Sequence, residues 1–365
     1  MSSGSATDGA LRGARRFPRR IEDLSAATMS RIMGRAVTSI SVIADTSGTT
    51  SRARLAAHGD EVPDSVFVKM AAQTGATRLM GELGRLGETE VQFYRQLSAE
   101  LAGAVPAAYG SSFDGPTGRF VLVLQDLADG QCQFPDTLHP FTKDQAALVV
   151  ELLARLHGTF WGRVDSGRFG WLYSGSDDPS VPLVPTMLRT SARRLATRTP
   201  IPVADGEFII QHYPAVARLI DTPPHTVLHG DAHRGNCYFR GAGQNVSAGL
   251  LAWQAVRCGH PARDLAYTLI TSMSTADRQR CERELLDTYR RALAAAGGPD
   301  LQRDELWRRY RQAAAYAYVA TTIVAGLGGM QSADIALAGL ELAVAAVHDL
   351  DTVAALQGPD LGGTS

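Results

Sequence analysis

Residues 229–236 carry the side chains of this chain that are best suited to chemistry. They follow the short apolar segment Thr226–Leu228 and read His229-Gly230-Asp231-Ala232-His233-Arg234-Gly235-Asn236. Phosphoryl transfer to a hydroxyl needs a group that accepts the hydroxyl proton and cations that neutralise the phosphate oxygens. Asp231 is a candidate for that base, and Asn236 offers an uncharged oxygen ligand to magnesium. We expect His229 and Arg234 to shape the loop through hydrogen bonds.

Two later segments continue the pattern, Leu250-Leu251-Ala252-Trp253-Gln254 and Asp264-Leu265-Ala266-Tyr267. Together with residues 229–236 they resemble the aminoglycoside phosphotransferase/choline kinase superfamily, most closely its ecdysteroid-kinase-like branch. Those relatives read His-Gly-Asp-x-His-x-x-Asn, then an apolar pair with Asp-Trp/Phe-Gln, and later Asp-Leu-Ala-Tyr. The alternative for residues 229–236 is an ordinary Asp/Asn-rich turn between strands, but that alternative leaves the ordered series of motifs unexplained.

The resemblance covers about residues 21–350 and implies an α+β fold of the protein-kinase-like, bilobal type. A small N-lobe with an antiparallel sheet and a larger, mostly helical C-lobe would hold ATP and Mg²⁺ between them. The implied function is ATP-dependent transfer of a phosphoryl group to a hydroxyl of a small molecule. In relatives the Asp of Asp-Leu-Ala-Tyr braces the catalytic loop, so the resemblance assigns Asp264 a structural role.

Position 252 is where the chain departs from these relatives. They carry an Asp there that bridges the metal to the nucleotide phosphates, whereas this chain has Ala252, whose methyl group cannot bind a metal. Magnesium favours octahedral oxygen coordination, usually with one or two carboxylates beside phosphates and water. We expect the loss of this carboxylate to lower the rate by about 10²–10⁴. The rival hypothesis is therefore a pseudokinase, which binds a nucleotide or metabolite without turnover.

A lysine and a glutamate are expected to hold the nucleotide phosphates. Val66-Phe67-Val68-Lys69-Met70 is a short apolar strand with one Lys, and helical spacing follows over residues 88–97. A lone strand lysine is usually solvated, but in third-strand position Lys69 matches the family lysine that pairs with phosphates. The resemblance makes Glu90 its ion-pair partner. Glu88 lies about 200° away around the helix, so only one of the two can face Lys69.

Two further segments are expected to contact the nucleotide. Residues 45–51 form a polar turn that includes Gly48 and Thr49, whose backbone N–H groups and hydroxyls could cover phosphates. Taken alone, this turn is as well explained by an ordinary hairpin. The apolar strand that begins at Phe120 ends in Gln125-Asp126-Leu127, which resembles the family hinge, whose backbone groups would hydrogen-bond the adenine edge.

Composition limits the partners. The net charge of -1 argues against nucleic acid, and four cysteines without paired metal spacing favour free thiols in a cytoplasmic protein. Residues 1–20 are rich in Ser, Gly and Arg, which favours a disordered basic tail over an organellar transit peptide. Residues 313–333 carry no charge but are rich in Ala, Gly and Thr. We therefore expect a buried helix there rather than a membrane span.

We expect a basic tail over residues 1–20, a nucleotide-binding N-lobe over 21–128, a C-lobe over 129–356 and a flexible tail over 357–365. The C-lobe would carry the catalytic loop and the acceptor pocket, and the protein would be a monomer or homodimer. The stretch expected to line this pocket is rich in arginine (Arg189, Arg193, Arg194 and Arg198 against Asp205 and Glu207). This balance favours a neutral or hydrophobic alcohol over a polycationic aminoglycoside. Aromatic residues such as Tyr316 could line the pocket or pack in the core.

Overall fold

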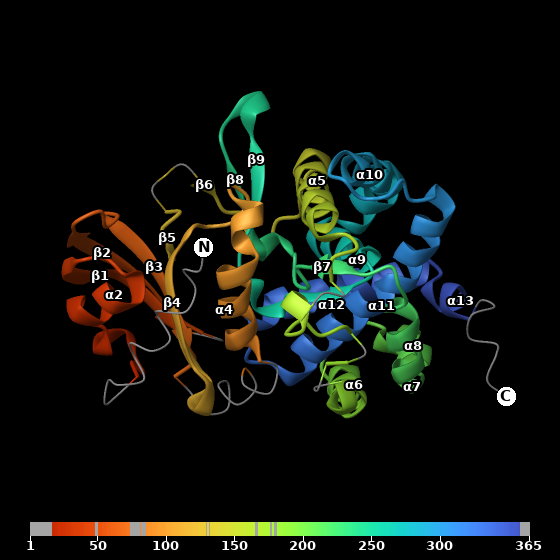
Figure 1. Ribbon diagram of the computed structural model, residues 1–365. Coiled ribbons are helices and arrows are strands. Elements are labelled where there is room, and N and C mark those ends of the chain that lie inside the picture. The colour runs from red at the N-terminus through yellow and green to blue at the C-terminus, as the bar shows by residue number, and fades with distance from the viewer. Residues whose placement is uncertain are drawn as a thin grey trace. The chain divides into compact units, whose positions relative to one another are not determined.

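The computed structural model describes residues 17–47, 50–73, 81, 85–128, 130, 132–164, 167–175, 177–178 and 181–357. The chain divides into two compact units (Figure 1). The first unit contains the chain as far as Gln133 together with Leu250–Ala255, and the second contains Phe134–Gly249 and the chain from Val256 onward. The predicted boundary lies at residues 128/129, and the prediction had placed Leu250–Ala255 in the C-lobe.

An antiparallel sheet forms the larger part of the first unit. Its strands are β1 (Val37–Ser47), β2 (Thr50–Gly59), β3 (Ser65–Ala71), β4 (Ala108–Asp114) and β5 (Arg119–Gln125), in the order β1-β2-β3-β5-β4. Successive residues of a strand point to opposite faces of the sheet. In β3, Val66, Val68 and Met70 accordingly enter a hydrophobic core with α2 (Ala26–Met33), whereas Lys69 points to the other face.

The helix α4 (Leu86–Gln96) supplies the buried partners for that other face. Glu90, Val91, Phe93 and Tyr94 are its buried residues, a spacing that places them along one side of the helix. The remaining elements of this unit are short: η1 (Ile21–Asp23), η2 (Ser98–Leu101), η3 (Gly115–Thr117), β6 (Cys132–Gln133) and η9 (Trp253–Ala255).

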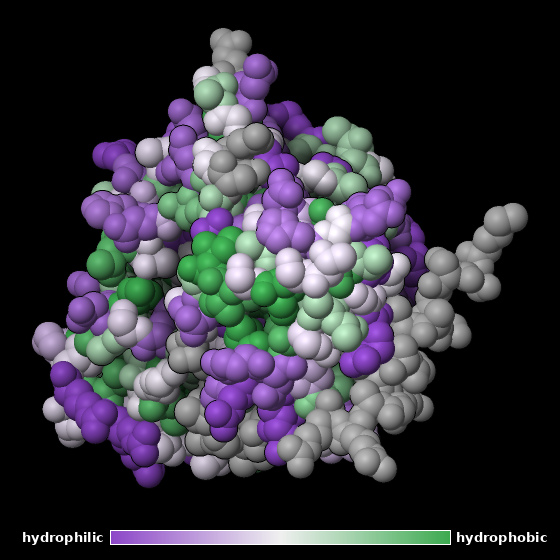
Figure 2. Space-filling view, turned by 90° about the vertical axis from the view of Figure 1, so that its left-hand side faces the viewer, coloured by the Kyte–Doolittle hydropathy of each residue, from purple (hydrophilic) through white to green (hydrophobic). Residues whose placement is uncertain are grey.

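On the face drawn in Figure 2, apolar residues gather near the middle of the view.

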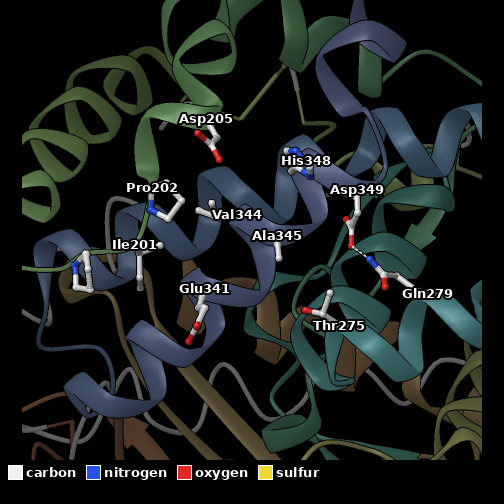
Figure 3. A pocket seen from close by; sticks show the side chains of 11 residues that line it. Ile201, Pro202, Asp205, Thr275, Gln279, Glu341, Val344, Ala345, His348 and Asp349 are labelled. Atoms are coloured by element: carbon white, nitrogen blue, oxygen red, sulfur yellow. Dashed lines mark hydrogen bonds between the residues drawn. The ribbon is translucent and has the colours of Figure 1, made fainter.

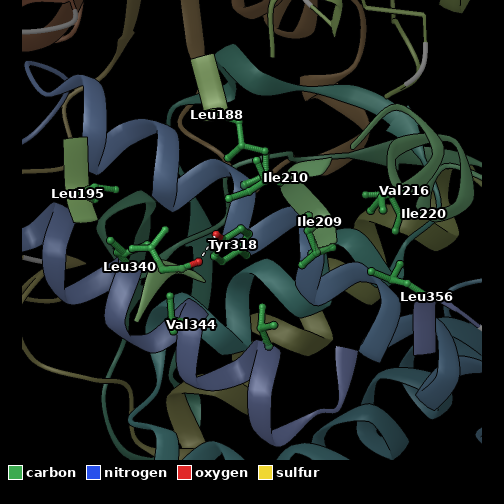
Figure 4. Close-up of a cluster of buried hydrophobic side chains, with 14 of the residues drawn as sticks. Leu188, Leu195, Ile209, Ile210, Val216, Ile220, Tyr318, Leu340, Val344 and Leu356 are labelled. Atoms are coloured by element: carbon green, nitrogen blue, oxygen red, sulfur yellow. Dashed lines mark hydrogen bonds between the residues drawn. The ribbon is translucent and has the colours of Figure 1, made fainter. Parts of the chain in front are cut away.

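Long helices dominate the second unit. They are α5 (Lys143–Phe160), α6 (Val184–Ala196), α10 (Thr275–Ala295), α11 (Arg303–Leu327) and α12 (Ala333–Asp349), with the shorter α7 (Glu207–Gln211), α8 (Tyr213–Ile220), α9 (Ala262–Ser272) and α13 (Thr352–Leu356). One core cluster joins residues of α6, α7, α8, α11 and α12 around Tyr318 (Figure 4). A small antiparallel-sheet unit and a larger, mostly helical unit confirm the predicted α+β class.

The uncharged segment 313–333 is largely helical, as expected. Its first part belongs to α11, where Ala313, Ala314 and Tyr318 are buried. The helix ends at Leu327 because Gly328 and Gly329 adopt positive φ angles of 72° and 81°, outside the helical region. Among the described residues, no helix is both long and apolar enough to cross a membrane.

Short strands frame residues 229–236 in the second unit. β7 (Thr226–Leu228) pairs antiparallel with β10 (Arg257–Gly259), and β8 (Cys237–Arg240) neighbours β9 (Ser247–Leu250). The loop between β7 and β8 ends in the single turn η7 (Arg234–Asn236). Other single turns are η4 (Gly167–Phe169), η5 (Val181–Leu183), η6 (Val203–Gly206) and η8 (Gly243–Asn245). The loop is therefore fixed at both ends by strands.

Candidate active site

Lys69 and Glu90 form a buried ion pair in the first unit. Lys69 Nζ lies 2.6 Å from Glu90 Oε2, and the two residues are 6% and 1% exposed. Glu88, the other candidate, pairs instead with Arg85 at 2.7 Å. A buried ammonium needs an opposite charge to offset its lost hydration. The pair therefore holds a cationic Nζ at a fixed place on the sheet.

The segment that contains Ala252 is fastened to this pair. Lys69 Nζ also donates a hydrogen bond to Gln254 Oε1 at 3.1 Å. Trp253 is fully buried and stacks on Phe93 of α4, with ring centroids 3.8 Å apart and an interplanar angle of 6°. The side chains on the C-terminal side of position 252 are thus locked by packing and by a charged hydrogen bond.

Ala252 itself adopts a left-handed backbone conformation, with φ at 58°. Residues with a Cβ rarely do so, and Asn and Asp tolerate this region better than Ala because their side chains hydrogen-bond locally. The conformation costs an alanine about 1–2 kcal/mol. The backbone at position 252 therefore has a shape that suits Asp, Asn or Gly, while the residue present is Ala.

The hinge residues are engaged within the first unit. The Gln125 N–H donates to Ala107 O at 2.8 Å, so this N–H already has a protein partner. Asp126 accepts from Arg54 Nε at 3.0 Å and from the Ala128 N–H at 3.0 Å. Burial raises the pKa of Asp126, but these hydrogen bonds outweigh it and the pKa is lowered overall. Leu127 is buried. The predicted Gly48 and Thr49 lie outside the described residues.

Asp264 braces the loop of the second unit from the first turn of α9. Its Oδ2 accepts the His229 N–H at 2.7 Å and its Oδ1 accepts the Gly230 N–H at 2.9 Å. His157 Nε2 lies 3.3 Å from Oδ2, and His157 Nδ1 lies 2.8 Å from Tyr289 Oη. Burial raises the pKa of Asp264, but the His157 hydrogen bond and charge lower it, and the net shift is downward. The buried carboxylate therefore stays ionised and fixes two loop amides.

Asp231 and Asn236 come together within the loop. Asn236 Nδ2 donates to the backbone carbonyl of Asp231 at 2.8 Å and to Asp231 Oδ2 at 3.0 Å. With the amide nitrogen directed at Asp231, the amide oxygen of Asn236 faces away from it. Asp231 Oδ1 accepts a hydrogen bond from Tyr267 Oη at 2.9 Å. The Asp231 side chain is 26% exposed, so its remaining acceptor sites are accessible.

Two tyrosines contact the loop, Tyr267, for which the sequence analysis gives no role, and Tyr316, which it expects in the acceptor pocket or the core. Tyr267 donates to Asp231, and Tyr316 Oη donates to the Gly230 carbonyl at 2.8 Å. Tyr267 belongs to the Asp-Leu-Ala-Tyr motif, so its position one turn after Asp264 could have indicated a shared helix face. Tyr316 lies 86 residues from Gly230 along the chain, and no local pattern indicates that contact.

His229 and Arg234 both make loop hydrogen bonds. His229 Nδ1 accepts the Asp231 N–H at 3.2 Å. Arg234 is 5% exposed and donates from Nε to Thr137 O at 2.6 Å, while its backbone N–H donates to Ser272 Oγ at 3.0 Å. Burial lowers the pKa of Arg234. Burial also raises the pKa of the Cys237 thiol, which keeps it a neutral filler beside the loop.

A cavity of about 430 Å³ lies elsewhere in the second unit (Figure 3). The segment 200–205, the start of α10 and the second half of α12 line it. Of the stretch expected to line the acceptor pocket Asp205 takes part, whereas none of the residues predicted for the catalytic loop, the metal or the nucleotide does. One of its acids, Asp349, is already paired with Arg278 at 2.6 Å. Across the described part of the chain, no three His, Cys, Asp or Glu side chains cluster as a metal-binding group.

Comparison with known proteins agrees with this geometry. Residues 81–313, more than half of the chain, match the model of the Phosphotransferase enzyme family (APH), and the protein belongs to that family. No curated protein matches the sequence.

Solved structures share the fold at low sequence identity. The GDP complex of wild-type aminoglycoside 2'-phosphotransferase-IIIa is 12% identical, with a TM-score of 0.51 over 86% of this chain and 93% of that one. Choline kinase LicA from Streptococcus pneumoniae is 15% identical, with a TM-score of 0.50 over 86% and 94%. A choline/ethanolamine kinase family protein from Mesorhizobium loti is 14% identical, with a TM-score of 0.50 over 87% and 92%.

Proposed function

We propose that the protein is an ATP-dependent phosphotransferase that acts on a hydroxyl of a small molecule. The observation that carries the proposal is the braced loop, in which Asp231 is held by Tyr267 and Asn236 while its side chain remains accessible. Membership of the Phosphotransferase enzyme family supports the same reaction class. The assignment to the ecdysteroid-kinase-like branch stays a prediction.

In this proposal Asp231 orients the acceptor hydroxyl and accepts its proton. A general base must lie within hydrogen-bond reach of the proton that it removes, with its carboxylate in a fixed direction. The donors Tyr267 and Asn236 fix the two carboxylate oxygens, and an ionised carboxylate can accept about four hydrogen bonds. One or more acceptor sites therefore remain for the substrate hydroxyl.

The nucleotide side of the reaction falls to the first unit. Lys69, paired with Glu90, is proposed to neutralise phosphate oxygens, because a fixed ammonium stabilises the charge that develops during transfer. We propose that backbone groups of Asp126 and Leu127 form hydrogen bonds with the adenine or guanine ring of the nucleotide. Gly48 and Thr49 are proposed to cover its phosphates. A structural relative, aminoglycoside 2'-phosphotransferase-IIIa, holds GDP, so GTP is tested beside ATP.

Magnesium would be held by fewer protein ligands than usual. The amide oxygen of Asn236 suits a hard cation, and its direction is set by the two hydrogen bonds from Nδ2. Position 252 offers a methyl group where a carboxylate would complete the set. Bound Mg²⁺ would neutralise phosphate charge, and Asp231 keeps its role toward the acceptor. We therefore propose a slow enzyme that needs a high Mg²⁺ concentration.

The second candidate function is nucleotide or metabolite binding without turnover, and Ala252 is the observation that favours it. Its test uses one sample for two measurements: calorimetry with ATP or GTP and Mg²⁺, and single-turnover transfer of labelled phosphate to an acceptor. Binding together with transfer supports the phosphotransferase, whereas binding with no transfer to any acceptor supports the binding protein.

The acceptor is proposed to be a neutral or hydrophobic alcohol, such as a steroid-like, macrolide or sugar hydroxyl. Arg189, Arg193 and Arg194 lie exposed on or next to the last turns of α6, a charge that disfavours a polycation. A panel of such alcohols, with choline and aminoglycosides as cationic counterparts, is screened for nucleotide consumption and for products by mass spectrometry. Preferential use of the cations would overturn this choice of acceptor.

We propose that the protein is cytoplasmic and that it is a monomer or a homodimer.

A further inference from the structure

Tyr267 reaches the proposed base from the same helix face as the loop brace. Asp264 and Tyr267 are three residues apart in α9, so their side chains lie on one side of the helix. Asp264 receives the N–H groups of His229 and Gly230, and Tyr267 donates to Asp231 Oδ1 at 2.9 Å. One helix face therefore fixes three consecutive loop residues, two through the backbone and one through the side chain.

Tyr316 fixes the same loop residue, Gly230, through its carbonyl. The Tyr316 hydroxyl donates to the Gly230 carbonyl at 2.8 Å, while the Gly230 N–H is held by Asp264. The guanidinium of Arg263 lies over the Tyr316 ring, 3.9 Å from the centroid, and the centroids of the Tyr267 and Tyr316 rings are 5.5 Å apart. Gly230 adopts φ of 82°, a conformation open to glycine, so both backbone polar groups of this residue are held in a backbone shape that few residues adopt.

We infer that Tyr267 and Tyr316 are positioning residues for phosphoryl transfer, Tyr267 by orienting the Asp231 carboxylate and Tyr316 by fixing the peptide that precedes it. The inference rests on the proposed role of Asp231 as the base. Tyr267 is 8% exposed, and its hydroxyl, the only polar group of the side chain, donates to Asp231. This arrangement is expected of a side chain that orients another.

The chemistry separates this role from simple packing. A tyrosine that only packs loses little when its hydroxyl is removed, whereas one that orients a reacting carboxylate lowers kcat with KM nearly unchanged. Burial and the nearby Asp231 charge raise the pKa of Tyr267 well above its usual value, so the tyrosine remains a donor at neutral pH. His233, with Nε2 3.8 Å from Asp231 Oδ1, is unchanged in the variants below.

The test compares Tyr267→Phe and Tyr316→Phe with Tyr318→Phe. Tyr318 is a matched control because it lies on the same helix as Tyr316, is fully buried, and donates to a carbonyl remote from the loop, that of Val203, at 2.7 Å. We expect Tyr267→Phe to lower kcat about ten- to a hundredfold with KM nearly unchanged. Tyr316→Phe should lower kcat about three- to tenfold, and Tyr318→Phe should leave it unchanged.

A double-variant comparison separates the role of Tyr267 from a general loss of structure. In the Asp231→Asn background, Tyr267→Phe should change the residual rate less than about twofold, because the carboxylate that it orients is gone.

An equal loss of rate in both backgrounds, or a loss confined to KM, overturns the role of Tyr267. A wild-type rate in Asp231→Asn overturns the proposed base instead. The two failures are therefore distinguishable.

Discussion

The two units differ in how completely they keep the residues of a phosphotransferase. In the second unit the loop 229–236 has every side chain of its motif, and hydrogen bonds from α9 and α11 hold it. In the first unit Lys69, Glu90 and Gln254 are joined to one another, yet residue 252 of the same unit is an alanine where the sequence motif predicts an aspartate.

The comparison shows that the packing of a segment does not require the side chain that could bind a metal. The segment around Ala252 is held by the stacking of Trp253 on Phe93 and by the Lys69–Gln254 hydrogen bond, neither of which needs a side chain at position 252. The backbone there stays left-handed although alanine disfavours it. In the second unit, by contrast, the proposed base is itself part of the hydrogen-bond network, so a change at Asp231 disturbs several contacts.

The largest expected effect is that of replacing Asp231 in the second unit. Asp231→Asn should lower turnover by about 10²–10⁴, because a positioned base contributes about that factor, while nucleotide affinity stays nearly unchanged. Single-turnover transfer and calorimetry on the same preparation measure the two quantities. Most of the rate surviving in a folded Asp231→Asn protein would show that another group removes the proton.

The next effect tests the first unit. Lys69→Ala should weaken ATP binding about ten- to a hundredfold, since hydrogen bonds to charged groups contribute about 1.5–3 kcal/mol. Because the change leaves the Glu90 carboxylate buried without its partner, the double variant Lys69→Ala/Glu90→Gln serves as the control for folding. Calorimetry with Mg²⁺ measures affinity, and equal affinity in variant and wild type would contradict the assignment of Lys69.

Restoring a carboxylate at position 252 should increase the activity of the protein. Ala252→Asp is expected to raise phosphotransfer or slow ATP hydrolysis at least about tenfold, because the carboxylate would add the metal ligand that the set lacks. Ala252→Asn is the matched control, similar in shape and in tolerance of a left-handed backbone but without the charge. Turnover should depend more steeply on Mg²⁺ in the wild type than in Ala252→Asp. Equal rates and equal Mg²⁺ dependence would mean that another group serves as the ligand.

Much of the fold and part of the site could be predicted from the sequence, for local reasons. The family resemblance assigned Glu90 to Lys69, and the helix period allowed only one of Glu88 and Glu90 to face it, which the Lys69–Glu90 pair confirms. The eight-residue loop motif placed Asp231 and Asn236 in one loop, although it did not predict their hydrogen bond. These contacts are set by short stretches of chain.

The rest depends on packing between distant segments. Tyr316 reaches Gly230 only because α11 packs beside α9, and nothing in the sequence near either residue indicates this. The left-handed backbone at Ala252 was also out of reach, since alanine gives no signal of a positive φ. The grouping of Leu250–Ala255 with the first unit likewise follows from the contacts of Trp253 and Gln254 rather than from chain order.

A smaller effect concerns the acid sensitivity of the second unit. His260 is 5% exposed and its Nδ1 accepts the Ala262 N–H at 3.2 Å. Burial first, and the Arg309 charge second, lower the pKa of His260 from 6.5 to about 3. Between these values the unfolded chain binds a proton that the folded protein does not, so stability falls as pH drops, by at most about 1.4 kcal/mol per pH unit. His260→Gln should flatten this slope in denaturant titrations between pH 6.5 and 4. An unchanged slope would show that His260 titrates normally.

The smallest effect isolates the backbone at position 252 from the missing carboxylate. Glycine adopts a left-handed φ without the Cβ clash that costs alanine about 1–2 kcal/mol, but it gives the unfolded chain about 0.4–1 kcal/mol of extra entropy. Ala252→Gly should therefore raise the free energy of unfolding by about 0.5–1 kcal/mol. Ala255→Gly, three residues later in η9 and without a positive φ, should lower it by a similar amount. Denaturant midpoints followed by tryptophan fluorescence measure both changes, because Trp253, one of the four tryptophans, is buried in the same unit. Ala252→Gly should leave turnover at the wild-type level, since relief of strain adds no metal ligand. A rise in turnover equal to that of Ala252→Asp would mean that the strained backbone, rather than the absent carboxylate, limits the reaction.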